Sequence, residues 1–245
     1  DFETPPFIME ALRKRLQHPV LGYTIEPADY WPTVQEWILS HHGWQTKREW
    51  LRYIPGIVKS IGMVINVFVK PDEKVIIQPP VYHPFRLVPE KMGREVVYNP
   101  LKEVNGRYEM DFEQLESIID ERCKVLILSS PHNPGGVVWP KETLIRLAEI
   151  CHRHGILVIA DEIHSEMAFP QYKHHPFPTV SPEAAACSLT FMAPSKTFNI
   201  AGIVTSYAIV PDDQIRERFF RFMQAGEFDF GTIFAFTATT AAYTY

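Results

Sequence analysis

Short runs of apolar residues, separated by segments with helical periodicity, constrain the fold of this chain most strongly. Five runs are apolar at nearly every position, as strands buried on both faces of a parallel sheet are. They span residues 74–78, 124–129, 156–160, 188–192 and 203–210. Between two of them, residues 140–154 place Leu144, Leu147, Ala148 and Cys151 on one helical stripe. This alternation predicts an α/β architecture with a mainly parallel sheet.

Further helices are expected from the same periodicity. They cover residues 6–16, 29–41, 57–69, 82–92, 110–119 and 212–223. The 21 prolines are spread between these segments and are not gathered in one linker. The length of 245 residues allows one large domain or two smaller ones.

The composition narrows the classes of function. A net charge of −5 gives no basic excess for binding nucleic acid or an anionic membrane surface. The longest apolar runs are too short to cross a bilayer, and the first residues do not form a signal peptide. Three scattered cysteines, Cys123, Cys151 and Cys187, fit a reducing compartment. The histidines of CHRHG and YKHHP are interpreted as a helix end and a loop, so no metal site is expected. We therefore expect a cytoplasmic protein.

Polar groups follow the strands at the edge where α/β sheets bind their ligands. The side chains are Tyr82, Asn133, Asp161 and Lys196, and a Pro-Gly turn opens the helix that begins at Ile57. Each has an ordinary explanation by itself, because Asn-Pro-Gly-Gly forms turns, Asp caps helices and most lysines are exposed. Jointly they match the chemical groups that pyridoxal phosphate (PLP) needs in a binding site. These groups are an amine for its aldehyde, a carboxylate for its ring nitrogen, N–H groups for its phosphate and an aromatic ring for stacking.

Three motifs carry Asn133, Asp161 and Lys196: SSPHNPGG, ADEIH and APSKTFNIAG. They resemble the PLP-dependent class I/II aminotransferase family, fold type I, and within it the cystathionine β-lyase or cysteine C–S lyase branch. The separations of 28 residues from Asn133 to Asp161 and 35 from Asp161 to Lys196 make the signal specific. The likeness covers essentially the whole chain.

The resemblance implies a fold and a domain division. A three-layer α/β/α large domain with a mainly parallel seven-stranded sheet is expected over residues 49–245. Residues 1–48 are expected to form an N-terminal segment and part of a small domain. The chain is expected to be a fragment that lacks the C-terminal small domain. That domain would carry the arginine for the substrate α-carboxylate, and no arginine here is assigned to it.

The resemblance also implies residue roles. Lys196 would form a Schiff base with PLP and later remove the substrate α-proton. Asp161 would pair with the pyridinium nitrogen, and Asn133 would hydrogen-bond the phenolic oxygen of the cofactor. Tyr82 would stack on the ring and face the substrate.

Further roles concern the phosphate and the oligomer. The backbone of Ile57 and Val58 would hold the phosphate, aided by the helix dipole. Tyr23 would reach the phosphate of a neighbouring subunit, which implies a homodimer.

The motif departs from the aminotransferase pattern at three positions. Ala193 stands where many relatives carry a hydroxyl that contacts the phosphate, and Ser195 is a possible substitute. His164 stands where aminotransferases usually have tyrosine, and Val204 where they usually have arginine. Both changes favour the lyase branch.

These features predict a PLP-dependent carbon–sulfur β-lyase that converts cystathionine or a related cysteine S-conjugate to thiol, pyruvate and ammonia. The alternatives are a class I/II aminotransferase, which needs the same lysine and ring, and a PLP-binding or regulatory protein without turnover.

Overall fold

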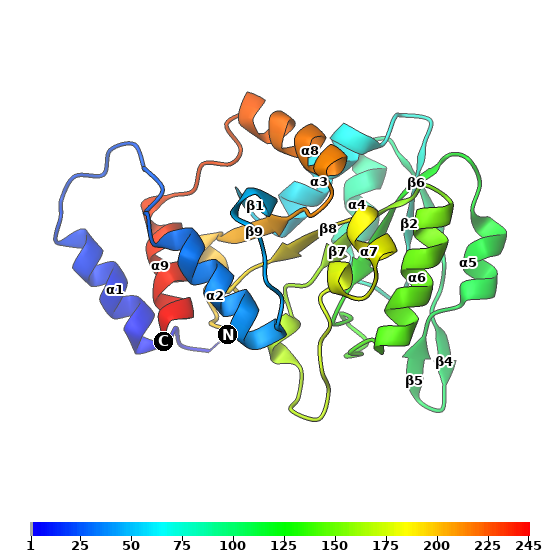
Figure 1. The fold of residues 1–245 in the computed structure, drawn as a ribbon, viewed down its shortest axis with the longest axis horizontal. Helices are drawn as coiled ribbons and strands as arrows, with labels where there is room; N and C mark the ends of the chain where they lie inside the picture. The colour runs from blue at the N-terminus through cyan, green and yellow to red at the C-terminus, as the bar shows by residue number, and fades with distance from the viewer. Residues whose placement is uncertain (1) are drawn as a thin grey trace.

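A seven-stranded sheet forms the centre of the computed structural model, which describes residues 2–245 (Figure 1). The strand order is β1-β9-β8-β7-β6-β2-β3. The strands are β1 (Leu51–Ile54), β2 (Lys74–Ile77), β3 (Glu95–Tyr98), β6 (Cys123–Ser129), β7 (Leu157–Asp161), β8 (Ser188–Met192) and β9 (Ser206–Ile209). A separate hairpin pairs β4 (Lys102–Val104) with β5 (Arg107–Glu109).

The direction of the strands brings several loops to one edge of the sheet. Strands β8, β7, β6, β2 and β3 are mutually parallel, whereas β9 is antiparallel to both of its neighbours, β8 and β1. The carboxyl ends of the parallel strands and the amino end of β9 therefore meet at the same edge.

Helices cover both faces of the sheet, as the alternation of its side chains requires. One face packs against α3 (Ile57–Phe68), α4 (Pro84–Lys91) and α8 (Asp213–Ala225). The other packs against α5 (Phe112–Ile118), α6 (Lys141–Arg153) and α7 (Pro182–Ala186). In β7, Ile159 faces the first core and Val158 the second. These layers confirm the predicted three-layer α/β/α architecture and the seven-stranded, mainly parallel sheet.

A third cluster lies at the β1–β9 end of the sheet (Figure 1). Its helices are α1 (Pro6–Leu16), α2 (Tyr30–His42) and α9 (Ile233–Thr244). Large aromatic side chains fill it, among them Tyr30, Trp31, Tyr207 and Phe236. Helices α1 and α9 thus pack together beside β1 and β9, although they are far apart in the sequence. Residue 1 of the expected N-terminal segment lies outside the described residues.

All seven predicted helices are present, and both ends of each lie within two residues of those expected. The predicted strand over 203–210 is wrong at its start. Residues Ala201–Ile203 form a 3-10 turn, and Val204 has a left-handed backbone with φ of 56°, so the strand begins only at Ser206. Periodicity did not indicate β3, the β4–β5 hairpin, α7 or α9.

Within residues 2–245, no helix combines the length and apolar character needed to cross a membrane.

Candidate active site

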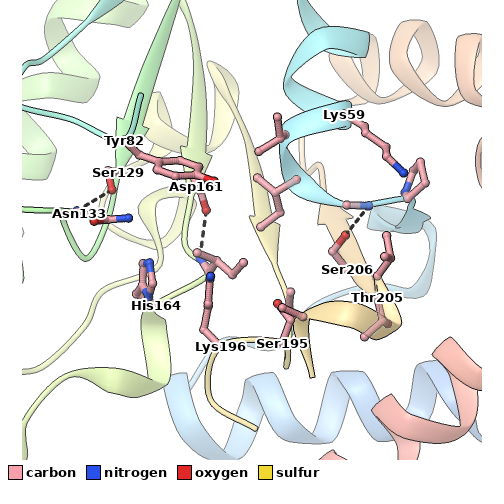
Figure 2. Close-up of a pocket in the computed structure, with 18 residues that line it drawn as sticks. Lys59, Tyr82, Ser129, Asn133, Asp161, His164, Ser195, Lys196, Thr205 and Ser206 are labelled. Atoms are coloured by element: carbon pink, nitrogen blue, oxygen red, sulfur yellow. Dashed lines mark hydrogen bonds between the residues drawn. The ribbon is translucent and has the colours of Figure 1, made fainter. Parts of the chain in front are cut away.

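A cavity of about 330 Å³ opens where these strand ends meet. Figure 2 shows Tyr82, Asn133 and Asp161 along one side, with the first turn of α3 opposite. The cavity is lined by each predicted site residue except Tyr23. These lining residues are Ile57, Val58, Tyr82, Asn133, Asp161, His164, Ser195 and Lys196.

Lys196 lies in the loop that follows β8, and its exposed side chain points toward Asp161 (Figure 2). Ser195 before it is buried, and its carbonyl accepts the Ile200 amide at 2.9 Å. This hydrogen bond closes the loop behind the lysine, and the Lys196 amine lines the cavity together with Ser195. Such an amine can act as a nucleophile or a base.

Asp161 ends β7 and is only 8% exposed. Its Oδ1 accepts the Ile163 amide at 3.2 Å. Burial raises the pKa of Asp161 to about 7, and the charge of Glu162 adds to this, whereas the Ile163 amide and the Lys196 charge oppose it. A carboxylate so poorly solvated is suited to a cationic group placed against it.

Asn133 and Tyr82 are joined through the backbone. The Tyr82 amide donates to the Asn133 carbonyl at 3.1 Å, and the Asn133 amide donates to Ser129 Oγ at 3.0 Å. Ser129 is a buried cavity residue that the motifs did not single out. The Tyr82 side chain is 37% exposed, which leaves room for a ligand beside it. The asparagine amide and the tyrosine ring are therefore held on the same wall.

The first turn of α3 supplies the opposite wall. Gly56 precedes it with φ of 100°, and no side chain caps the helix. The N–H groups of Ile57, Val58 and Lys59 have no partner within the helix, because the first four N–H groups of any helix lack one. Ser206 Oγ accepts the Gly56 amide at 3.0 Å and donates to the Ile54 carbonyl at 2.9 Å. This wall can receive an anion.

Several cavity residues escaped the sequence reasoning. Lys59, Thr205 and Ser206 line the cavity, and Figure 2 shows all three on the side of the Gly56 turn. Lys59 lay only three residues beyond Gly56, so its place in the first turn could have been noticed. Thr205 and Ser206 gave no local signal, because they come from the start of the antiparallel strand.

The departures noted in the motif are visible in the cavity. Ala193 and Val204 both line it, so neither a hydroxyl nor a guanidinium stands at these two places. His164 also lines the cavity, with Nδ1 3.4 Å from Met167 Sδ. Burial lowers the pKa of His164, and the nearby Lys196 charge lowers it further. The imidazole is therefore neutral at neutral pH.

Tyr23 lies apart from this cavity. Its side chain is fully exposed, and it borders a smaller hollow of about 230 Å³ with Arg15, His18 and Ile25. In this single chain it contributes nothing to the site.

The family model for aminotransferase class I and II matches residues 1–242. A curated relative, cystathionine beta-lyase PatB of Bacillus subtilis, is 42% identical over 244 residues, which are 99% of this chain and 63% of that protein. The crystal structure of cystalysin from Treponema denticola, which contains PLP, superposes with a TM-score of 0.94 and 36% identity over 99% of this chain and 62% of the other. The PLP-bound C-S lyase of Staphylococcus hominis gives a TM-score of 0.93 and 31% identity over 100% and 62%. The chain thus spans less than two thirds of the length of these relatives.

Proposed function

The chain belongs to the aminotransferase class I and II family, and from that premise we propose that the protein is a PLP-dependent C–S β-lyase. Its substrate would be cystathionine or a related cysteine S-conjugate. The products would be a thiol, pyruvate and ammonia, with one water consumed. The observation that carries the proposal is that Lys196 and the buried carboxylate of Asp161 line the same cavity.

The donor set of the cavity fits PLP. One wall offers free N–H groups and the Lys59 ammonium for a phosphate, and the other offers Asp161 for a ring nitrogen. Burial raises the pKa of Asp161 to about 7, and a protonated pyridine against the carboxylate would add a counter-charge to that of Lys196. When bound, PLP supplies an aldehyde for a lysine amine and a ring that accepts electrons from the substrate α-carbon.

Each residue of the wall near Lys196 has a separate task in this proposal. Lys196 Nζ holds the cofactor and then moves the proton from the substrate α-carbon. Asp161 keeps the ring nitrogen protonated through its negative charge. Asn133 donates to the phenolic oxygen, and Tyr82 covers the ring and faces the substrate.

The remaining cavity residues would orient the ligand. Ile57 and Val58 present N–H groups to the phosphate, with Ser195 as an added hydroxyl near it. His164, held neutral by its surroundings, can accept or donate a hydrogen bond at the substrate side without adding charge. The presence of His164 favours the lyase over the aminotransferase, because aminotransferases of the family that the chain resembles usually have tyrosine at this position.

The quaternary and domain arrangement is part of the proposal. The full exposure of Tyr23 suits a side chain that reaches the phosphate site of a second subunit in a homodimer. We divide the chain at residue 48, with residues 1–48 as the N-terminal segment and part of a small domain, and residues 49–245 as the PLP-binding domain. A cytoplasmic location is proposed on the basis of the cysteine usage.

The test uses the full-length protein with cystathionine and without a keto-acid acceptor. We expect pyruvate and free thiol in equal amounts. If no thiol appears while the amino group is transferred rapidly to 2-oxoglutarate, the protein is an aminotransferase and the proposal is wrong. If PLP binds and neither reaction occurs, the protein is a PLP-binding module without turnover.

A further inference from the structure

The loop that carries Lys196 is held from behind by the N-terminal helices. Among the described residues, the lining of the cavity begins at Pro55, so α1 and α2 do not enter it. Phe198 nevertheless packs against Phe7 of α1 and Trp37 of α2. The Asn199 carbonyl accepts from Thr4, which lies just before α1, and Thr197 is linked to α2 through Glu166. The N-terminal segment is therefore placed to set the position of Lys196 without contacting a ligand.

Glu166 is the polar centre of this contact. Its side chain is 8% exposed, in the turn Ser165–Met167 just after His164. Its Oε1 accepts from Trp37 Nε1 at 3.1 Å and lies 3.1 Å from His42 Nε2, both on α2. Its Oε2 accepts from Ser165 Oγ at 2.8 Å and, over a longer 3.4 Å, from Thr197 Oγ1. One carboxylate thus joins α2, the turn after Asp161 and the lysine loop.

The charge of Glu166 is maintained in this setting. Burial alone would raise the pKa of its carboxyl, but the hydrogen bonds and charge of His42, with those from Trp37 and Ser165, bring the pKa below its ordinary value. His42 is the last residue of α2. Glu166 is therefore an anion bound to α2.

A second buried pair borders the first. His174 Nε2 lies 2.9 Å from Glu162 Oε2, and Glu162 Oε1 accepts the Phe177 amide at 2.7 Å. The His174 ring meets the His42 ring edge to face, with centroids 5.5 Å apart. Glu162 follows the last residue of β7 and does not line the cavity that Asp161 faces. The turn after Asp161 is therefore fixed by buried carboxylates at both of its ends.

Aromatic packing also stabilises the loop that carries Lys196. Phe198 lies against Phe7 of α1, Trp37 of α2 and Tyr243 of α9, at centroid distances of 6.3, 5.7 and 6.3 Å. Asn199, which has a left-handed φ of 52°, accepts a hydrogen bond from Thr4 Oγ1 at 3.3 Å. Its own amide donates to the Phe2 carbonyl.

We propose that Glu166 is a positioning residue for Lys196, which fastens the lysine loop and the Asp161 turn to the end of α2. The role assigned to Lys196 rests on the proposed function. The fastening itself is a property of the chain without any ligand. Loss of the Glu166 charge should make the lysine loop more mobile. No residue that lines the cavity is substituted in such a variant.

The test compares wild type with Glu166→Gln in the full-length protein. Hydrogen exchange of residues 195–200, measured by mass spectrometry without PLP, should be about tenfold faster in the variant, since a hydrogen bond to a charged group contributes enough free energy for such a change. The rate at which PLP becomes trapped on Lys196 by borohydride should fall about fivefold, because a misplaced reacting group is slow to react. His42→Gln, which replaces one of the two partners of Glu166 on α2, should change both rates in the same direction.

Asp120→Asn is the matched control, because it breaks the 2.6 Å ion pair with Lys74 and Asp120 lies outside the cavity lining. It should lower stability and leave both rates within about twofold of wild type. Unchanged exchange in both the Glu166 and the His42 variants, or an equal change in the control, would overturn the proposal. If wild type forms no adduct at Lys196, the proposed function fails, whereas the exchange comparison still decides the role of Glu166.

Discussion

Ser129 and Asp161, each the last residue of its strand, lie opposite one another in the parallel pairing of β6 and β7. This register places the loop after β6 beside the carboxylate at the end of β7. Ser129 Oγ then accepts the Asn133 amide at 3.0 Å, and the Ser129 carbonyl accepts the Trp139 indole at 2.9 Å. One strand end thus positions Asn133 relative to Asp161.

Ser129→Ala should destabilise the chain by about 1–3 kcal/mol, because the Asn133 amide loses its acceptor in a poorly solvated place. Urea unfolding measures the change. Ser130→Ala is the matched control, since Ser130 Oγ is buried and makes no hydrogen bond within residues 2–245. That variant should be neutral or slightly more stable. An equal loss in both serine variants would contradict the assigned role of Ser129.

Lys196→Ala should abolish covalent attachment of PLP, because the other lysine among the described lining residues, Lys59, lies at the α3 turn on the opposite wall from Asp161 (Figure 2). The measurement is the absorbance band near the edge of the visible range, followed by borohydride reduction and peptide mapping. Lys59→Met supplies the comparison, since Lys59 lines the same cavity beside the α3 turn. It should keep the adduct at Lys196 and weaken PLP binding by about tenfold at low salt, with less effect at high salt. An adduct mapped to Lys59 in wild type would reverse these roles.

Asp161 should make the PLP-free protein less stable as pH rises. Its pKa moves from 3.8 in the unfolded chain to about 7 in the folded one, so the folded state binds more protons between these values. The free energy of unfolding therefore contains a contribution that is complete below pH 3.8 and is lost as pH rises through about 7, amounting to at most about 4 kcal/mol.

Asp161→Asn should remove this slope, and PLP should reduce it in wild type by supplying a cation. Denaturant unfolding at several pH values measures both effects. His132, whose pKa burial lowers to about 4, contributes a slope of opposite sign between that value and 6.5 in both proteins. The informative quantity is therefore the difference between wild type and variant. An identical pH profile in the two would count against a raised pKa at Asp161.

Gly56→Ala should cost about 1–3 kcal/mol and should weaken anion binding at the start of α3. The reason is backbone strain, since Gly56 has φ of 100° and ψ of 140°, while an added Cβ would meet Val204 at an ordinary 3.4 Å. Unfolding free energy and PLP affinity are the two measurements. Gly22→Ala, where a Cβ would meet nothing within 4 Å, should leave both unchanged. Full retention of stability in the Gly56 variant would contradict the strain argument.

Local patterns predicted the elements that pack in a regular way. The central strands are apolar at nearly every position because both faces are covered, and α6 shows its stripe because one face alone is buried. The edge strand β3 is exposed at both ends, and the β4–β5 hairpin is mostly exposed, so neither carries such a pattern. Helix α9 escaped notice because apolar residues occur around most of its circumference.

The sequence by itself determined which polar side chains gather at the cavity, because Lys196, Asp161, Asn133 and Tyr82 each follow an apolar run and parallel strands bring such positions to one edge. Only the tertiary structure decided which partners hold them. Ser206 reaches the Gly56 turn because β9 runs antiparallel, and Glu166 meets His42 across 124 residues of chain. Contacts of that kind depend on strand direction and on how helices pack. Neither can be predicted from a short segment of sequence.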